Sequence, residues 1–226
     1  MSINKESKDI SIIYKEKKYV YKIYKEGSLI YGYETGKVLF EKSSNGSYTL
    51  NVKYPCKVNL IIVGAGGGCA SWGGYYANNY SLNSSGGGGS GGYVHGALKI
   101  TPGSYTIVVG KGGAGVRNAG AGVGPQTASD GGQSSAFGQK ANGGKGGKAG
   151  NDGTGGAGGT TSTTLTGVSG NSGGSMSAVL AYGSYPVQNI SGGSSKYGGY
   201  GRGGYIANQS TSTINGGNGY VKITVA

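Results

Sequence analysis

Residues 143–159 read GGKGGKAGNDGTGGAGG, and every third residue of this stretch is glycine. The unbroken series is Gly144, Gly147, Gly150, Gly153, Gly156 and Gly159. A polyproline-II helix has three residues per turn, so these glycines line one edge of such a helix. An edge without Cβ atoms lets a neighbouring helix approach closely enough for hydrogen bonds between backbones. The stretch therefore predicts a packed bundle of polyproline-II helices, where a flexible linker would need no strict register.

The same spacing recurs elsewhere in the chain, which carries 53 glycines in 226 residues. Three-residue series are found at Gly86, Gly89, Gly92; at Gly167, Gly170, Gly173; and at Gly198, Gly201, Gly204. Doubled glycines such as Gly143–Gly144 clear two edges, as a helix in the interior of a bundle requires. Collagen is excluded because the chain has only 4 prolines and no continuous Gly-X-Y repeat.

Between the glycine-rich stretches, the chain carries the patterns of β-strands. Residues 47–53 alternate apolar and polar side chains, 58–63 form one apolar run, and Pro102-Gly103 separates two further alternating segments. The strands expected are 47–53, 58–63, 93–100, 105–109, 134–137 and 219–226. No segment shows helical periodicity. We therefore expect an all-β fold, an antiparallel β-sandwich with a glycine-rich polyproline-II helix bundle and essentially no α-helix.

The first part of the chain predicts a separate small unit. Residues 10–14, 19–24 and 29–33 read as short antiparallel strands joined by lysine-rich turns. Three short strands cannot bury a core of their own, so they should pack on something else. We expect residues 1–35 to be a small β docking segment and residues 36–226 to form the glycine-rich domain.

The two cysteines are predicted to be free thiols. Cys56 and Cys69 flank the apolar run 57–63. A strand of that length separates its ends by ~20 Å, whereas a disulfide needs Cα atoms within ~7 Å.

Charge and hydropathy set expectations about location. The net charge is +12, which could attract anionic surfaces but is more simply explained as an aid to solubility. Residues 1–24 contain lysines and no apolar signal region. No stretch approaches the ~20 apolar residues of a membrane span. We expect a protein without a signal peptide, made in the cytoplasm and not inserted in a membrane.

The sequence predicts no catalytic, cofactor or metal site. Residues 60–70, LIIVGAGGGCA, resemble a dinucleotide fingerprint, but Cys69 replaces the third glycine and residues 71–75 cannot begin a helix. The Gly-Lys pairs lack the flanking residues of a phosphate-binding loop. His95 is the sole histidine, and Asp130 and Asp152 are the sole acids after residue 60. General acid–base chemistry and metal binding therefore have few candidates.

Aromatic side chains interrupt the glycines in stretches that read as loops. Exposed aromatics on loops held by a scaffold suit recognition of a sugar or a protein surface. The alternative is that the rings stack over polyglycine and form core. The hypothetical receptor-binding residues are Trp72, Tyr75, Tyr76, Tyr80, Tyr182, Tyr185, Tyr197, Tyr200, Arg202 and Tyr205.

Several motifs occur in one order that resembles the glycine-rich domain of bacteriophage tail-fibre, tail-tip and other virion proteins. They are the strand and GAGGG at 58–68, GGYV at 91–94, PGSYTIVVG at 102–110, GGQSSAFG at 131–138, and GGNGYVKI at 216–223. The resemblance covers roughly residues 36–226. It implies a β-sandwich whose glycine-rich excursions form polyproline-II bundles, with distal loops that contact a host receptor. Residues 72–83 and 160–209 depart from the pattern and align with no family site.

The resemblance implies a structural virion protein of the tail-fibre or adhesin type. Residues 10–33 would bind other virion proteins, and the remainder would project toward a sugar or outer-surface protein of the host. We expect a homo-oligomer in the virion with no specific nucleic-acid binding. Two alternatives remain open. The tract 197–205, YGGYGRGGY, resembles RGG-type RNA-binding segments, and residues 160–166 suggest an ice-binding polyproline-II bundle.

Overall fold

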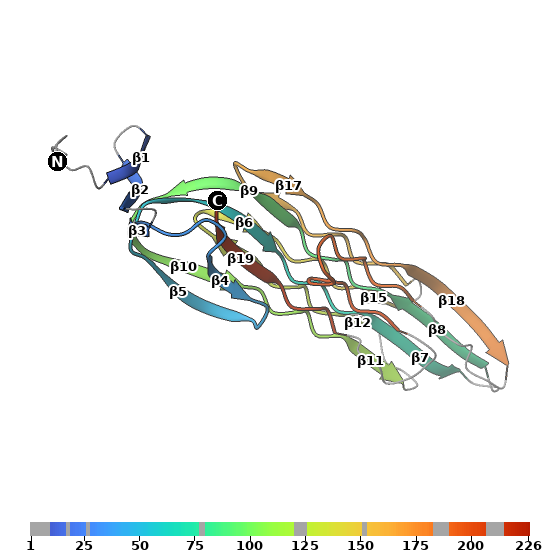
Figure 1. Ribbon diagram of the computed structural model, residues 1–226. Helices are drawn as coiled ribbons and strands as arrows, with labels where there is room; N and C mark the ends of the chain where they lie inside the picture. The colour runs from blue at the N-terminus through green and yellow to red at the C-terminus, as the bar shows by residue number, and fades with distance from the viewer. Residues whose placement is uncertain are drawn as a thin grey trace.

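A computed structural model describes residues 10–16, 19–25, 28–76, 80–119, 126–150, 153–182, 190–206 and 215–226. Within these ranges the chain is all-β, with no α-helix and with sheets that are antiparallel except for one parallel strand pair at the far end. None of the described residues forms a helix long and apolar enough to cross a membrane. The molecule is elongated: a β-sandwich lies toward the end that carries the N-terminus, and extended segments connect it to a second sheet at the far end (Figure 1).

The sandwich consists of two five-stranded antiparallel sheets. In order, the first sheet contains β17 (Thr166–Val168), β9 (Tyr93–Ile100), β6 (Cys56–Val63), β19 (Tyr220–Val225) and β4 (Val38–Lys42). The second contains β16 (Thr161–Ser162), β14 (Gln139–Ala141), β13 (Ser134–Ala136), β10 (Gly103–Val109) and β5 (Gly46–Val52). Leu60, Ile62, Ile107 and Ile223 are almost fully buried in the common core. Burial of each such side chain favours folding by about 1.5–3 kcal/mol, and the predicted strands are confirmed.

The N-terminal strands form a sheet of their own, also as expected. It contains β1 (Ile10–Glu16), β2 (Tyr19–Lys25) and β3 (Ser28–Tyr31), all antiparallel. The ring of Tyr31 packs edge-on against Tyr54 at 4.8 Å. Tyr33 lies against the sandwich core, and its hydroxyl accepts a hydrogen bond of 2.7 Å from Lys53 N–H. Tyr31 in β3 and Tyr33 just after it thus contact residues beyond the expected boundary at residue 35.

Extended glycine-rich segments link the sandwich to the far end of the molecule (Figure 1), and the described residues contain ten of them. We call them PP1 (64–69), PP2 (87–92), PP3 (110–115), PP4 (128–133), PP5 (142–147), PP6 (153–160), PP7 (169–174), PP8 (190–195), PP9 (201–206) and PP10 (215–219). Odd-numbered segments run away from the sandwich, and even-numbered segments return to it.

The segments have the three-residue repeat of polyproline II. Gly64 and Gly67 both donate their N–H to PP2, while Ala65 and Gly68 both donate to PP4. In PP2, likewise, residues 87 and 90 donate to PP7 and residues 88 and 91 donate to PP9. Because the direction of the N–H groups repeats every third residue, these segments turn once in three residues. The repeat confirms the polyproline-II interpretation of the glycine spacing.

The hydrogen bonds place the ten helices on a hexagonal lattice. PP1 is bonded to six neighbours, which are PP2, PP3, PP4, PP5, PP9 and PP10. PP2 also has six, which are PP1 and PP5 to PP9. The bonds between the surrounding helices complete three layers: PP4–PP5–PP6, then PP3–PP1–PP2–PP7, then PP10–PP9–PP8. All six N–H groups of residues 87–92 donate to a neighbouring helix, at 2.8–3.0 Å, so this buried backbone is satisfied.

Glycine is required at most positions where one helix faces a neighbour, and only small side chains such as those of Ala65 and Ser90 are buried among the helices PP1 and PP2. A Cβ added at Gly144 would approach Gly89 O, one at Gly67 would approach Lys145 O, and both contacts would be under 3.0 Å. The predicted register is confirmed in this sense at Gly144, Gly147, Gly156 and Gly159. No side chain fits because the neighbour's backbone, which cannot rotate away, occupies the space.

The far end of the molecule corrects one expectation. The aromatic stretches at 72–80 and at Tyr182 were predicted to be loops, but their described residues belong to strands of a four-stranded sheet. Its strands, in order, are β11 (Val116–Ala119), β7 (Ala70–Tyr76), β8 (Tyr80–Gly86) and β18 (Ser175–Tyr182), and β12 (Gln126–Thr127) pairs with β15 (Lys148–Ala149) nearby. The physical reason is continuity: β7 and β8 extend PP1 and PP2, which are already hydrogen-bonded neighbours.

The lattice predicts unequal tolerance among glycines. Gly144→Ala should lower the free energy of unfolding by about 3 kcal/mol, as overpacking does, since its Cβ would meet the Gly89 backbone. Gly217→Ala is the matched control, because its Cβ would meet nothing closer than 3.4 Å. Chemical denaturation of both variants measures the difference. Equal losses at the two sites would contradict the packing.

Candidate functional site

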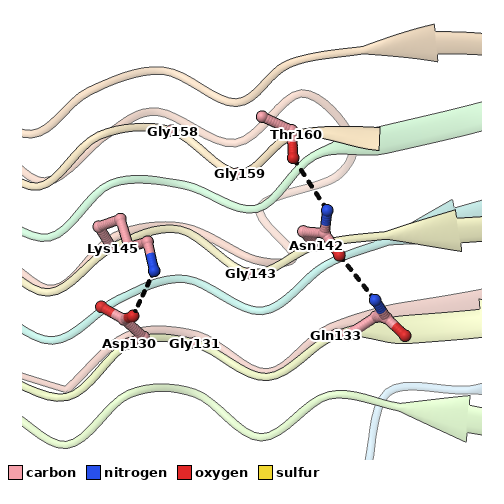
Figure 2. A pocket seen from close by; sticks show the side chains of 9 residues that line it. All are labelled: Asp130, Gly131, Gln133, Asn142, Gly143, Lys145, Gly158, Gly159 and Thr160. Carbon is pink, nitrogen blue, oxygen red and sulfur yellow. Dashed lines mark hydrogen bonds and ion pairs between the residues drawn. The ribbon is translucent and has the colours of Figure 1, made fainter. Parts of the chain in front are cut away.

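A hollow lies on the outer face of the bundle, over PP4, PP5 and PP6. Its volume is about 320 Å³. Figure 2 shows glycines along its floor and polar side chains at its two ends. The lining residues are Asp130, Gly131, Gln133, Asn142, Gly143, Lys145, Gly158, Gly159 and Thr160. The three helices form one outer layer of the lattice, so the hollow is a shallow depression in the surface of that layer.

Two rows of side chains cross the helices and bound the hollow. At one end, Lys145 Nζ lies 2.7 Å from Asp130 Oδ2, and Gly146 N–H donates to Asp130 Oδ1 at 2.9 Å. At the other end, Gln133 Nε2 donates to Asn142 Oδ1 at 2.6 Å, and Asn142 Nδ2 donates to Thr160 Oγ1 at 2.9 Å. Asn142 and Lys145 are one helical turn apart, so the rows are separated by ~9 Å along PP5.

The ion pair keeps the hollow electrically balanced. Partial burial raises the pKa of Asp130, but hydrogen bonds from Lys145 and from Gly146 N–H outweigh it and hold this pKa below its ordinary value of 3.8. The hydrogen bond to Asp130 raises the pKa of Lys145. Both groups are therefore charged at neutral pH, and their charges cancel.

The glycine floor is a consequence of helix packing. A Cβ at Gly143 would collide with Gly131, and a Cβ at Gly158 would collide with Gly170 O. The polar residues occupy the outward position of each turn, where a side chain fits. Sequence reasoning did not single out this group. One signal in the sequence could have indicated it: Asn142 and Lys145 are three residues apart, so they lie on the same edge of a polyproline-II helix, next to the edges that the glycines occupy.

Two of the aromatic residues proposed for recognition pack on the sandwich. Tyr197 and Tyr200 flank a tight turn at Gly198 and Gly199, whose φ values are 55° and 82°. Such positive φ angles favour glycine at both turn positions. The Tyr200 ring stacks on Tyr220 at 4.2 Å. Tyr197 is half-buried and stacks on neighbouring rings, at 5.7 Å from Tyr93 and 5.6 Å from Tyr220.

Arg202 and Tyr205 lie elsewhere, on PP9 in the layer opposite the hollow. The Arg202 guanidinium lies over the Tyr205 ring at 4.0 Å, a cation–π contact. Arg202 is exposed and Tyr205 is half-buried.

The other aromatic residues belong to the far sheet. Trp72, Tyr75 and Tyr76 are in β7, Tyr80 in β8 and Tyr182 in β18. The backbone pairs Tyr76 with Tyr80 and Tyr80 with Tyr182, so these three occupy one level of three adjacent strands. Tyr185 lies outside the described residues. The structure thus divides the predicted receptor-binding set among three places.

The two cysteines are buried, and the histidine packs against a tyrosine ring. Cys56 and Cys69 are free thiols, as predicted. Burial raises the pKa of the Cys56 thiol to about 11 and that of Cys69 to about 12, so both are protonated at neutral pH. His95 stacks on Tyr93 at 5.0 Å. In the described part of the chain, no three His, Cys, Asp or Glu side chains are grouped as metal ligands would be.

A β-sandwich whose strands continue into a hydrogen-bonded polyproline-II bundle defines a class of domains that depend on glycine for their packing. A family model described as a glycine-rich domain matches residues 42–226, and the chain belongs to this family. The match begins within β4 and covers the sandwich, the bundle and the far sheet. No curated protein matches the sequence.

A hydrogen bond from the Tyr220 hydroxyl to Glu41 makes the stability of the fold depend on pH. The hydroxyl donates to Glu41 Oε1 at 2.5 Å, and this hydrogen bond, with one from Lys222, lowers the pKa of Glu41 below 4.5. A carboxyl whose pKa is lower in the folded state stabilises the fold above its unfolded pKa, and this contribution disappears as pH falls through the folded value.

Tyr220→Phe should therefore make the thermal stability of the protein less dependent on pH under acidic conditions. Between about pH 5 and pH 3, the Tm of the wild type should fall more steeply than that of the variant. Tyr105→Phe is the control, since its hydroxyl bonds the Thr101 carbonyl and no carboxylate. Thermal scans across this pH range make the measurement. Parallel curves for wild type and Tyr220→Phe would refute the coupling.

Proposed function

We propose that the protein is a structural attachment module of a bacteriophage virion, of the tail-fibre or adhesin type. The observation that carries the proposal is the polarity of an elongated molecule. The sheet β1–β3 lies at one end, and the tyrosine-bearing strands β7, β8 and β18 end at the other (Figure 1). In this proposal the first end binds the particle and the second meets the host surface. The order of glycine motifs, which resembles that of phage virion proteins, supports the same role.

The bundle suits a spacer that must hold a binding surface at a fixed distance. Each helix of six residues spans ~19 Å at ~3.1 Å per residue. PP1 and PP2 are bonded on all six sides, so they cannot bend without breaking backbone hydrogen bonds. A rigid support reduces the entropy lost on binding, which favours attachment.

The far sheet offers residue types suited to recognition. Tyr76, Tyr80 and Tyr182 share one level of adjacent strands near the ends of those strands. Tyrosine provides large contact area at low conformational cost, which is why binding surfaces are rich in it. The proposed receptor is a sugar or a protein on the host surface.

Replacing Tyr76, Tyr80 and Tyr182 together with Ala tests the proposal. We expect phage carrying the variant to assemble normally and to lose adsorption by at least about 100-fold, since a few central aromatic residues dominate such interfaces. Plaque assays of unadsorbed phage measure the loss.

Arg202→Ala combined with Tyr205→Ala is the matched control, because these residues lie on PP9, away from the strand ends. It should leave adsorption unchanged. The attachment role fails if the far-sheet variant folds, assembles and adsorbs like the wild type. Circular dichroism separates that result from simple unfolding.

One observation favours a second candidate, binding of single-stranded nucleic acid. The stacked Arg202 and Tyr205 in a chain of net charge +12 resemble a base-stacking platform. We expect RNA binding to be weak and to fall steeply between about 50 and 200 mM salt, as it does when scattered lysines contact phosphates. Filter binding with a single-stranded RNA measures this. Tight, salt-resistant binding lost in Arg202→Ala would favour the nucleic-acid role instead.

A further inference from the structure

We infer that the hollow over PP4, PP5 and PP6 binds a neutral pyranose ring of a glycan. The site is separate from the far sheet, and its occupancy can be measured on the purified protein. The inference therefore does not depend on the attachment role. It rests on the shape of the hollow, on polar groups left without partners and on the balance of charge.

The polar side chains are preorganised. Asp130 is held by Lys145 and by Gly146 N–H, and the row formed by Gln133, Asn142 and Thr160 is joined by two hydrogen bonds. Side chains fixed before binding lose little entropy when a ligand arrives. Figure 2 shows the two rows facing each other across the glycine floor.

Hydrogen-bonding capacity remains on both sides of the floor. Within the described residues, Gln133 Oε1 and Gly143 N–H have no hydrogen-bond partner, although both residues line the hollow. Gly143 is one turn before Gly146, whose N–H donates to Asp130. Gln133 is one turn after Asp130 on the antiparallel helix, so Gly143 and Gln133 occupy neighbouring positions on PP5 and PP4. Lys145 has further N–H donors and Thr160 a hydroxyl, so the hollow offers donors and acceptors together.

A sugar ring satisfies these requirements better than an anion does. Each hydroxyl of a pyranose can donate and accept, which matches the mixed groups at the two rows. The rows are separated by ~9 Å, one turn of the helix, which accommodates a single ring with its hydroxyls. The Asp130–Lys145 pair leaves no net charge, so a phosphate or another anion would gain little. The floor has no side chains, so a flat ring face can approach the backbone.

Titration of ¹⁵N-labelled protein with the methyl glycosides of glucose, galactose and mannose tests the inference. For at least one of them, we expect shifts of the Gly143, Gly146 and Gly158 amide signals that saturate with a Kd of about 1 mM, the range for a ligand of this size in an open site. Gln133→Ala should weaken binding at least tenfold, because it removes a hydrogen-bonding side chain at one end of the hollow. The side chain is exposed, so its removal leaves the glycine contacts between helices intact.

Ala157→Trp should also abolish the shifts by filling the hollow, since Ala157 is exposed beside Lys145 on the next helix. Thr154→Trp, one turn away on the same helix and equally exposed, is the matched control and should bind normally. The variant with Ala at Tyr76, Tyr80 and Tyr182 should bind as well as the wild type, which separates this site from the attachment proposal. Absence of these shifts for all three glycosides, or equal shifts in the Ala157→Trp variant, would overturn the inference. So would a stronger response to inorganic phosphate.

Discussion

The close approach of a carbonyl oxygen to a glycine Cα is the contact on which the whole bundle depends. Gly88 lies against Gly67 O, and Gly144 lies against Gly89 O, each with too little space for a Cβ atom. That approach lets every N–H of PP2 reach a carbonyl on a neighbouring helix. Glycine loses more conformational entropy on folding than any other residue. The bundle has few apolar side chains that could offset this loss. Hydrogen bonds of about 1 kcal/mol each and dense packing offset it instead.

The sandwich and the bundle are one continuous arrangement. The strand order β16-β14-β13-β10 continues as the helix order PP6-PP5-PP4-PP3, and β17-β9-β6-β19 continues as PP7-PP2-PP1-PP10. The apolar core of the sandwich therefore fixes which neighbours are found by the helices that continue its strands, which are all of them except PP8 and PP9. Leu60, Ile62 and Ile223 provide hydrophobic free energy that the glycine segments lack. The far sheet inherits its strand pairing from the same lattice, at the opposite end of the helices.

Local patterns in the sequence predicted what depends on local geometry. The three-residue glycine series predicted the helices, alternation predicted the sandwich strands, and the separation of Cys56 from Cys69 predicted free thiols. The strands β7 and β8 were missed because their pairing is set by the helices PP1 and PP2 that they extend, and because their sequences lack apolar alternation. The hollow could not be predicted either, since it exists only because PP4, PP5 and PP6 are adjacent. The stacking of Tyr197 and Tyr200 against Tyr220 likewise depends on a turn that returns to the sheet.

A lattice of three-residue helices separates the residues that specify the fold from those that specify surface chemistry. At a surface helix such as PP5, two positions of each turn face other helices and must be glycine, while the third faces solvent. Asn142 and Lys145 occupy that third position on PP5, and Ala157 and Thr160 occupy it on PP6. Substitutions there change hydrogen-bonding groups and charge without entering the space between backbones. The outer layers can therefore carry different binding chemistry on an unchanged bundle, as the polar rows of the hollow and the Arg202–Tyr205 pair on the opposite layer already do.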